Sequence, residues 1–252
     1  MVKKDKLIKE LRKSVTFILV GTSHPGNIGA SARAIKTMGF SSMILVSPKE
    51  FPSETAFFRA KAATDVLEKI EIFPNLKSAI SDFELVIGTS ARNRKVPWPM
   101  INSKKAAQQI IAITKRGKQK IALVFGREDR GLTNEELGLC NLHVHIPANK
   151  DYSSLNLAQA VQIIAYEIRM QSLSDKKLKE QEWDVPLAKN EEIENLINHF
   201  ENLMNELDFY EIDNPRKLLT RMRRFFKRSK IDHLEANVFR GVISSIQKNL
   251  KK

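Results

Sequence analysis

The chain has 252 residues, of which 42% are hydrophobic, enough to bury the core of one large domain or of a domain with an appendage. Its formal net charge of +13 favours a polyanionic partner, most often nucleic acid, although a merely basic protein has the same balance. The one cysteine excludes an intramolecular disulfide and fits a reducing cytoplasm. No apolar run reaches the roughly 20 residues that span a bilayer, so we expect no membrane association.

Residues 14–170 alternate between short apolar runs and amphipathic stretches. The predicted strands cover residues 15–20, 43–46, 70–73, 85–87, 121–125 and 142–146. The predicted helices cover about 27–39, 53–68, 76–80, 103–114 and 155–170, with a short capped helix after Thr133. This alternation predicts an α/β fold with a mostly parallel sheet, in which ligands bind beyond the carboxyl ends of the strands.

The pattern changes near Ser172. Residues 172–190 mix charges of both signs without apolar periodicity and are interpreted as a linker. From about Glu191 the pattern is helical only. We therefore expect three parts: an α/β domain over 1–171 with a basic N-terminal lead-in, the linker over 172–190, and a basic helical RNA-binding domain over 191–252.

The expected helical domain has an apolar stripe and a basic segment. The stripe repeats every three or four residues, at Leu196, Phe200, Leu203 and Leu207. The segment 216–230 holds eight basic residues and no acid, and its apolar residues are expected to face the core, so that the charges share the outer face. A last helix is predicted over 233–248.

Four polar loops are candidate site loops, at 21–33, 88–98, 126–131 and 147–156. None matches GxGxxG or GxxxxGK[ST], which argues against a nucleotide-binding dehydrogenase or a P-loop protein. The chain has no HExxH and no paired CxxC, so no metal site is predicted. The scattered histidines are interpreted as structural.

Three of these loops carry a resemblance to a known family. NIGASAR (27–33), GREDRGL (126–132) and SSLNLAQA (153–160) resemble the three motifs of the SPOUT-superfamily RNA 2′-O-methyltransferases. The longer stretches TSHPGNIGASARA, GTSARNRKVPWPM, LVFGREDRGLTNEEL and YSSLNLAQAVQIIAYE are similar, in order and spacing, to the TrmJ-type enzymes. RRFFKR and EANVFRGV in the tail resemble the C-terminal extension of that type.

The resemblance implies a SPOUT fold with a C-terminal trefoil knot, S-adenosylmethionine as the cofactor, no metal, and a homodimer whose site joins both subunits. It implies methylation of the ribose 2′-hydroxyl of cytidine or uridine at position 32 in the tRNA anticodon loop. The implied cofactor-binding residues are Thr89, Ser90, Ala91, Gly126, Ile146, Ser153, Ser154 and Leu155. Without the resemblance, loop and helix-capping duties would account for the serines and threonines equally well.

Arg33 is the candidate catalytic residue. A guanidinium can stabilise developing oxyanion charge and hold a phosphate. It stays protonated and is a poor base, so Arg33 is expected to orient and stabilise rather than to accept the proton. The alternative is an ordinary surface helix residue.

The remaining candidates are structural residues of the motifs and RNA contacts. Asn27 is expected to cap the helix that begins there, Glu128 to hold the 126–131 loop through backbone N–H groups, and Asn156 to cap the last helix and pin the knot. Gly29 and Gly131 complete these motifs. The candidate substrate or RNA contacts are Arg92, Arg94, Tyr152, Arg221, Arg223 and Arg224. Solvated charge and plain packing remain alternatives for this second group.

Two rival functions stay open from the sequence. One is the same ribose methylation on ribosomal or another RNA, against which the tail argues. The other is a non-catalytic RNA-binding protein that has kept the fold, against which the intact motifs argue.

Overall fold

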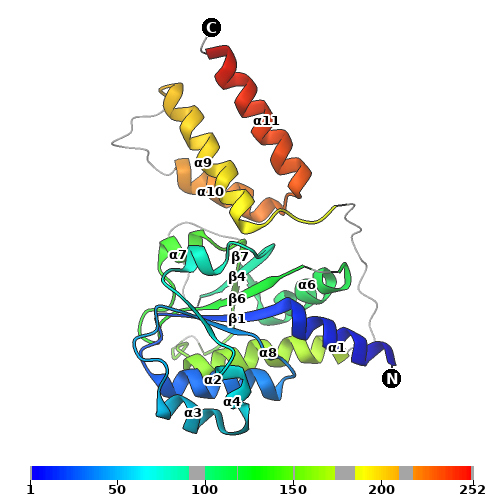
Figure 1. Ribbon diagram of the computed structural model, residues 1–252, viewed down its shortest axis with the longest axis vertical. Coiled ribbons are helices and arrows are strands. Elements are labelled where there is room, and N and C mark those ends of the chain that lie inside the picture. Colours follow the sequence, from blue (N-terminus) through cyan, green and yellow to red (C-terminus); the bar gives the residue numbers. More distant parts are fainter. Residues whose placement is uncertain are drawn as a thin grey trace.

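The computed structural model describes residues 2–90, 100–117, 119–149, 151–173, 185–209 and 218–250 (Figure 1). A seven-stranded sheet has the strand order β3-β2-β1-β6-β4-β7-β5, and its six pairings are all parallel. The strands are β1 (Val15–Val20), β2 (Met43–Val46), β3 (Glu71–Phe73), β4 (Leu85–Thr89), β5 (Met100–Asn102), β6 (Ile121–Phe125) and β7 (Leu142–His145). The predicted parallel α/β sheet is confirmed.

Helices cover both faces of this sheet, as a parallel sheet requires. One face lies under α1 (Val2–Ser14), α2 (Pro25–Thr37), α3 (Glu54–Ala60), α4 (Thr64–Leu67), α6 (Ser103–Lys115) and α8 (Leu157–Leu173). The other lies under α5 (Leu76–Ala79) and α7 (Asn134–Gly138). Alternate β1 residues enter the two cores: Phe17 and Leu19 one, Ile18 and Val20 the other.

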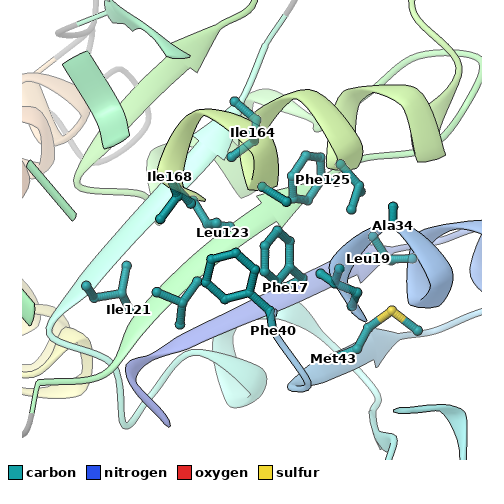
Figure 2. Close-up of a cluster of buried hydrophobic side chains, with 14 of the residues drawn as sticks. Phe17, Leu19, Ala34, Phe40, Met43, Ile121, Leu123, Phe125, Ile164 and Ile168 are labelled. Carbon is teal, nitrogen blue, oxygen red and sulfur yellow. The ribbon is translucent and has the colours of Figure 1, made fainter. Parts of the chain in front are cut away.

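The larger core is built around aromatic rings from β1 and its neighbours (Figure 2). The ring of Phe17 meets that of Phe40 edge-on, with centroids 5.4 Å apart, and stacks with that of Phe125 at 6.2 Å. Ile164 and Ile168 of α8 pack against this cluster, and Figure 2 shows the helix lying over it. Each ring is fully or nearly fully buried, so this core fixes the strands whose ends form the site.

Two predicted helices differ from the observed ones. The helix predicted from Asn27 begins at Pro25, because proline is well suited to the first helical position, so the prediction that Asn27 caps it was wrong. The helix predicted over 53–68 divides into α3, a 3-10 turn (Lys61–Ala63) and α4. Lys61 has φ +52°, which an α-helix of L-residues cannot continue through.

The C-terminal helices form a second, smaller core. They are α9 (Asn190–Glu206), α10 (Leu218–Ser229) and α11 (His233–Leu250), packed around Leu196 and Phe226. This helical module lies on the α7 side of the sheet in Figure 1. The Asn190 N–H donates to the Phe83 carbonyl at 2.8 Å, and the side chain of Asn141 donates to the Lys227 carbonyl.

The expectation that the basic residues of the helical module share its outer face was wrong in part. Lys227 is completely buried, and its Nζ lies 2.8 Å from Glu194 Oε1. Arg223 pairs with the same carboxylate. Phe225 and Leu207, both expected to face the core, are exposed. Which side chains of the helical module are buried therefore depends on the ion pairs with Glu194 as well as on the apolar stripe.

Candidate functional site

A cavity lies at the carboxyl ends of the central strands. The loops that follow β4, β6 and β7 line it. This is the end of the sheet at which α/β proteins bind ligands. Seven of the candidate cofactor residues line it: Thr89, Ser90, Gly126, Ile146, Ser153, Ser154 and Leu155. The eighth, Ala91, lies outside the described residues, as do Arg92 and Arg94. Segments far apart in the sequence thus contribute to one cavity.

The loop after β6 folds tightly on itself. The Arg127 N–H donates to the Gly131 carbonyl at 3.3 Å, and the Gly131 N–H donates back at 2.8 Å. A Cβ on Gly126 would lie 2.1 Å from the backbone of Gly131 and Leu132, and Gly131 has φ +69°. Glycine is therefore required at position 126 for closure of the loop itself.

An ion pair between Arg127 and Glu136 connects this loop to α7. Both terminal nitrogens of Arg127 donate to the Glu136 carboxylate at 3.0 Å. The same carboxylate accepts the Thr133 N–H, completing the capping box of α7. The hydrogen bonds from Arg127 to Glu136 raise the pKa of the guanidinium. The sequence predicted the capping box, but gave no indication that Arg127 would join it.

Glu128 ties the β6 loop to the start of α2. Its carboxylate accepts the Ser23 N–H at 3.1 Å, the Ser23 hydroxyl at 2.9 Å, the His24 N–H at 3.3 Å and the Asn27 side-chain amide at 2.9 Å. Burial opposes the charged form, but these hydrogen bonds outweigh it and lower the pKa of Glu128 to about 2. The prediction that Glu128 accepts backbone N–H groups agrees with these contacts, but the sequence did not indicate that Ser23, His24 and Asn27 would be its partners.

Asn27 and Asn156 extend this connection to the third motif. The Asn156 side-chain amide donates to Asn27 Oδ1 at 3.0 Å, and Asn156 Oδ1 accepts the Ala158 N–H at 2.9 Å at the start of α8. The hydrogen-bonded chain Glu128–Asn27–Asn156 therefore joins all three motifs. It holds the loop after β6 and the N-termini of α2 and α8 in one arrangement around the cavity.

Comparison with known proteins identifies the family. The profile of the SpoU rRNA Methylase family matches residues 14–166, and that of the tRNA methyltransferase TrmJ C-terminal domain matches residues 191–252. The chain belongs to the SpoU methylase family. A TrmJ tRNA (cytidine/uridine/adenosine-2′-O-)-methyltransferase of Pseudomonas aeruginosa is 41% identical over 93% of this chain and 94% of its own length.

Two further relatives agree with this assignment to the SpoU methylases. A tRNA (cytidine/uridine-2′-O-)-methyltransferase TrmJ of Photorhabdus laumondii is 40% identical, over 95% of this chain and 99% of its own. The crystal structure of TrmJ from Z. mobilis superposes with a TM-score of 0.79 at 29% identity, over 92% of this chain and 98% of its own. The likeness therefore includes the helical module as well as the sheet.

Not every candidate residue of this SpoU methylase lies at the cavity. Arg33 is an exposed residue of α2 and does not line it. It lies six residues beyond Asn27, which is about 9 Å along the helix axis. Gly29, also in α2, allows the helix to approach α3, because a Cβ there would lie 2.0 Å from the Ala56 carbonyl oxygen.

The candidate RNA contacts of the SpoU methylase differ in their surroundings. Tyr152 is 81% exposed and directly precedes the cavity residue Ser153. Arg221 is exposed on α10, whereas Arg223 forms an ion pair with Glu194 and Arg224 is half-buried.

Among the described helices, none is long and apolar enough to cross a membrane.

The residues of the cavity suit S-adenosylmethionine. Ile146, Leu155 and Leu157 offer aliphatic surface for a base, while the hydroxyls of Ser153 and Ser154 can hydrogen-bond polar groups. The rim carries two acids, Glu128 and Asp129, and two bases, Arg127 and Arg130, so its formal charges balance. No cluster of three metal-binding side chains occurs within the described residues.

Proposed function

We propose that the chain transfers a methyl group from S-adenosylmethionine to the ribose 2′-hydroxyl of the pyrimidine at position 32 in the tRNA anticodon loop. Its TrmJ relatives, about 40% identical over nearly the whole chain, are named as tRNA (cytidine/uridine-2′-O-)-methyltransferases. The observation that carries the proposal is the cavity lined by seven of the cofactor candidates and joined to α2 through Glu128, Asn27 and Asn156.

Different residues of the cavity would bind different parts of the cofactor. When bound, S-adenosylmethionine supplies the methyl group at an electrophilic sulfonium centre. Backbone groups around Ile146 and Leu155 would pair with the adenine edge, with their aliphatic side chains against its faces. Thr89 already donates its hydroxyl to the Val124 carbonyl at 3.1 Å, so its contribution is to fix the end of β4 rather than to bind through that hydroxyl.

Arg33 would act on the substrate ribose. Because its side chain is exposed and does not line the cavity of its own subunit, we propose that it serves a homodimer, in which Arg33 of the partner subunit approaches the cavity. There the guanidinium would hold the phosphate next to the target ribose and stabilise the oxygen as it loses its proton. A phosphate oxygen or water would accept that proton, because arginine stays protonated.

The tRNA would be held by positive charge. The chain carries 42 lysines and arginines against 29 acids. On α10, Arg221 and Arg228 are exposed, and phosphate contacts by such side chains make binding salt-dependent. Arg223, by contrast, serves the fold, so we propose Arg221 and Arg228 as the phosphate contacts of this helix.

The test is methyl transfer from labelled S-adenosylmethionine to unmodified tRNA, followed by nuclease digestion and nucleoside mass analysis. A 2′-O-methylpyrimidine at position 32 is expected, and the matched control, a synthetic tRNA with 2′-deoxyribose at that position, should accept no label. A base-methylated product would overturn the ribose assignment. No labelled tRNA from a chain that binds S-adenosylmethionine would overturn the tRNA assignment, and failure to bind S-adenosylmethionine would favour a non-catalytic RNA-binding protein.

A further inference from the structure

The loop after β6 presents four consecutive charged residues, 127–130, at the cavity. Two backbone hydrogen bonds between Arg127 and Gly131 close this loop into a tight turn, with Glu128, Asp129 and Arg130 between them. Because the turn is closed by its own backbone, its side chains are held at the cavity before any ligand binds. What they can bind depends on which of the four charges the protein already uses.

Two of the four charges are used by the fold. Both terminal nitrogens of Arg127 donate to the Glu136 carboxylate at 3.0 Å. The Glu128 carboxylate accepts four hydrogen bonds from the loop after β1 and from α2. A ligand that took over either group would break the hydrogen bonds that hold the loops together. Arg127 and Glu128 therefore shape the site rather than bind with their charges.

The other two charges are available to a ligand. Arg130 Nε lies 3.3 Å from Asp129 Oδ2, and the two side chains are 68% and 67% exposed. Among the residues that the structure describes, neither has another ion-pair partner. An exposed pair of this kind is weak and rearranges at little cost. It uses only Nε of Arg130, which leaves the two terminal nitrogens to donate to a ligand.

One cation beside one anion matches a zwitterion. The amino acid end of S-adenosylmethionine carries an ammonium and a carboxylate on the same carbon. A guanidinium binds a carboxylate through two parallel hydrogen bonds, and a carboxylate accepts hydrogen bonds from an ammonium. The aliphatic residues that suit the base, Ile146, Leu155 and Leu157, come from other segments of the cavity lining. The lining thus has an apolar part for the base and a charged part for the amino acid group.

We propose that Arg130 binds the carboxylate, and Asp129 the ammonium, of the amino acid end of S-adenosylmethionine. The inference rests on the proposed function, because it places that cofactor in the cavity. It adds a specificity: the cavity should discriminate against adenosine derivatives that lack the amino acid group. Neither residue was among the cofactor candidates taken from the sequence motifs.

The acid beside Arg130 argues for a zwitterion rather than for an RNA phosphate. A phosphate carries negative charge alone, so Asp129 would repel the group that Arg130 attracts. A zwitterion uses both side chains, with each charge set against its opposite. Arg130 and Asp129 therefore fit the cofactor better than they fit the backbone of the substrate.

Calorimetry with two ligands tests the role of Arg130 without turnover. S-adenosylhomocysteine keeps the amino acid group, whereas 5′-methylthioadenosine lacks it. Arg130→Ala should weaken the binding of S-adenosylhomocysteine about tenfold, because charged hydrogen bonds are lost at an exposed site. Its affinity for 5′-methylthioadenosine should stay within about twofold of the wild type, because that ligand has no carboxylate to lose. The matched control Arg240→Ala removes an exposed arginine from α11 and should leave both affinities unchanged.

A second variant tests the role of Asp129. Asp129→Asn should weaken the binding of S-adenosylhomocysteine several-fold, but not that of its analogue without the amino group. Because both side chains are mostly exposed, each variant should melt near the temperature of the wild type. An Asp129→Asn variant that loses affinity equally for both ligands would overturn the assignment of the ammonium.

Three results would overturn the role of Arg130. Equal losses for S-adenosylhomocysteine and 5′-methylthioadenosine in Arg130→Ala would show that the residue shapes the cavity instead. Unchanged binding of S-adenosylhomocysteine, with weaker binding of tRNA, would assign Arg130 to an RNA phosphate and leave the proposed function standing. A wild-type chain that binds neither ligand would overturn the proposed function and this inference together.

Discussion

Replacing Glu194 with alanine should strongly destabilise the helical module, because it leaves a buried ammonium group without its acid. The Lys227 side chain has no exposed surface, that of Glu194 retains 4%, and their charged atoms lie 2.8 Å apart. At an effective dielectric constant of about 20, attraction at this distance is about 6 kcal/mol, which the desolvation of two charges offsets. Breaking a buried pair by removing one partner costs about 3–5 kcal/mol, and we expect a loss in this range.

The pH dependence of this variant follows from the lysine. Burial lowers the pKa of Lys227, and Glu194 opposes that shift. Without Glu194 the folded-state pKa falls further, while the unfolded chain keeps a value near 10.5. The unfolded state then binds more protons between these two values. The stability of the variant should therefore rise as the pH rises toward 10.5, more steeply than that of the wild type.

Urea unfolding followed by circular dichroism at 222 nm measures both effects. The matched control Glu191→Ala removes an exposed acid from the same helix and should cost less than about 1 kcal/mol. The double variant Glu194→Leu, Lys227→Met should recover most of the loss, because apolar residues of similar volume replace buried pairs at little cost. A loss below 1 kcal/mol for Glu194→Ala, or no recovery in the double variant, would refute the reasoning.

Three further predictions concern the site. Arg33→Ala should keep the affinity for S-adenosylmethionine within several-fold by calorimetry but reduce tRNA methylation about 100-fold or more, since its role belongs to the transition state; near-normal turnover would contradict it. Glu128→Gln should flatten the acid dependence of thermal melting: the lowered pKa of Glu128 gives stability that is present above about 4.5 and lost as the pH falls through about 2. A variant curve parallel to that of the wild type would exclude this contribution. Gly126→Ala should cost about 1–3 kcal/mol in urea unfolding because its Cβ meets the backbone of the loop; Gly138→Ala, whose Cβ would make ordinary contacts, is the control, and equal effects would argue against the crowding.

Central strands were predictable because a parallel strand covered on both faces is a continuous apolar run. β1 and β6 are such runs, and both were predicted to the residue. β5 was missed because three residues, Met100–Asn102, carry too little pattern. The break at Lys61 was missed because it depends on backbone geometry, to which a lysine gives no sequence signal.

The candidate site was predictable in its parts but not in its connections. The motifs indicated which loops matter, and the described cofactor candidates do line one cavity. Glu128 and Asn27 are 101 positions apart in the sequence, and local sequence patterns do not predict contacts at that separation. Buried Lys227 was hidden in a basic run. Its partner Glu194 gave no signal either, because it lies about 160° around α9 from Leu196 of the predicted apolar stripe.

The hydrogen bond between Asn27 and Asn156 has a consequence for synthesis on the ribosome. It joins residues 129 positions apart, so a nascent chain that already displays α2 and β6 still lacks one wall of the cavity. The proposed cofactor would meet a complete cavity only after α8 has left the exit tunnel and docked. From that moment its binding would add to the stability of the finished sheet by mass action, so cellular cofactor supply should protect completed chains and leave truncated ones exposed to proteolysis.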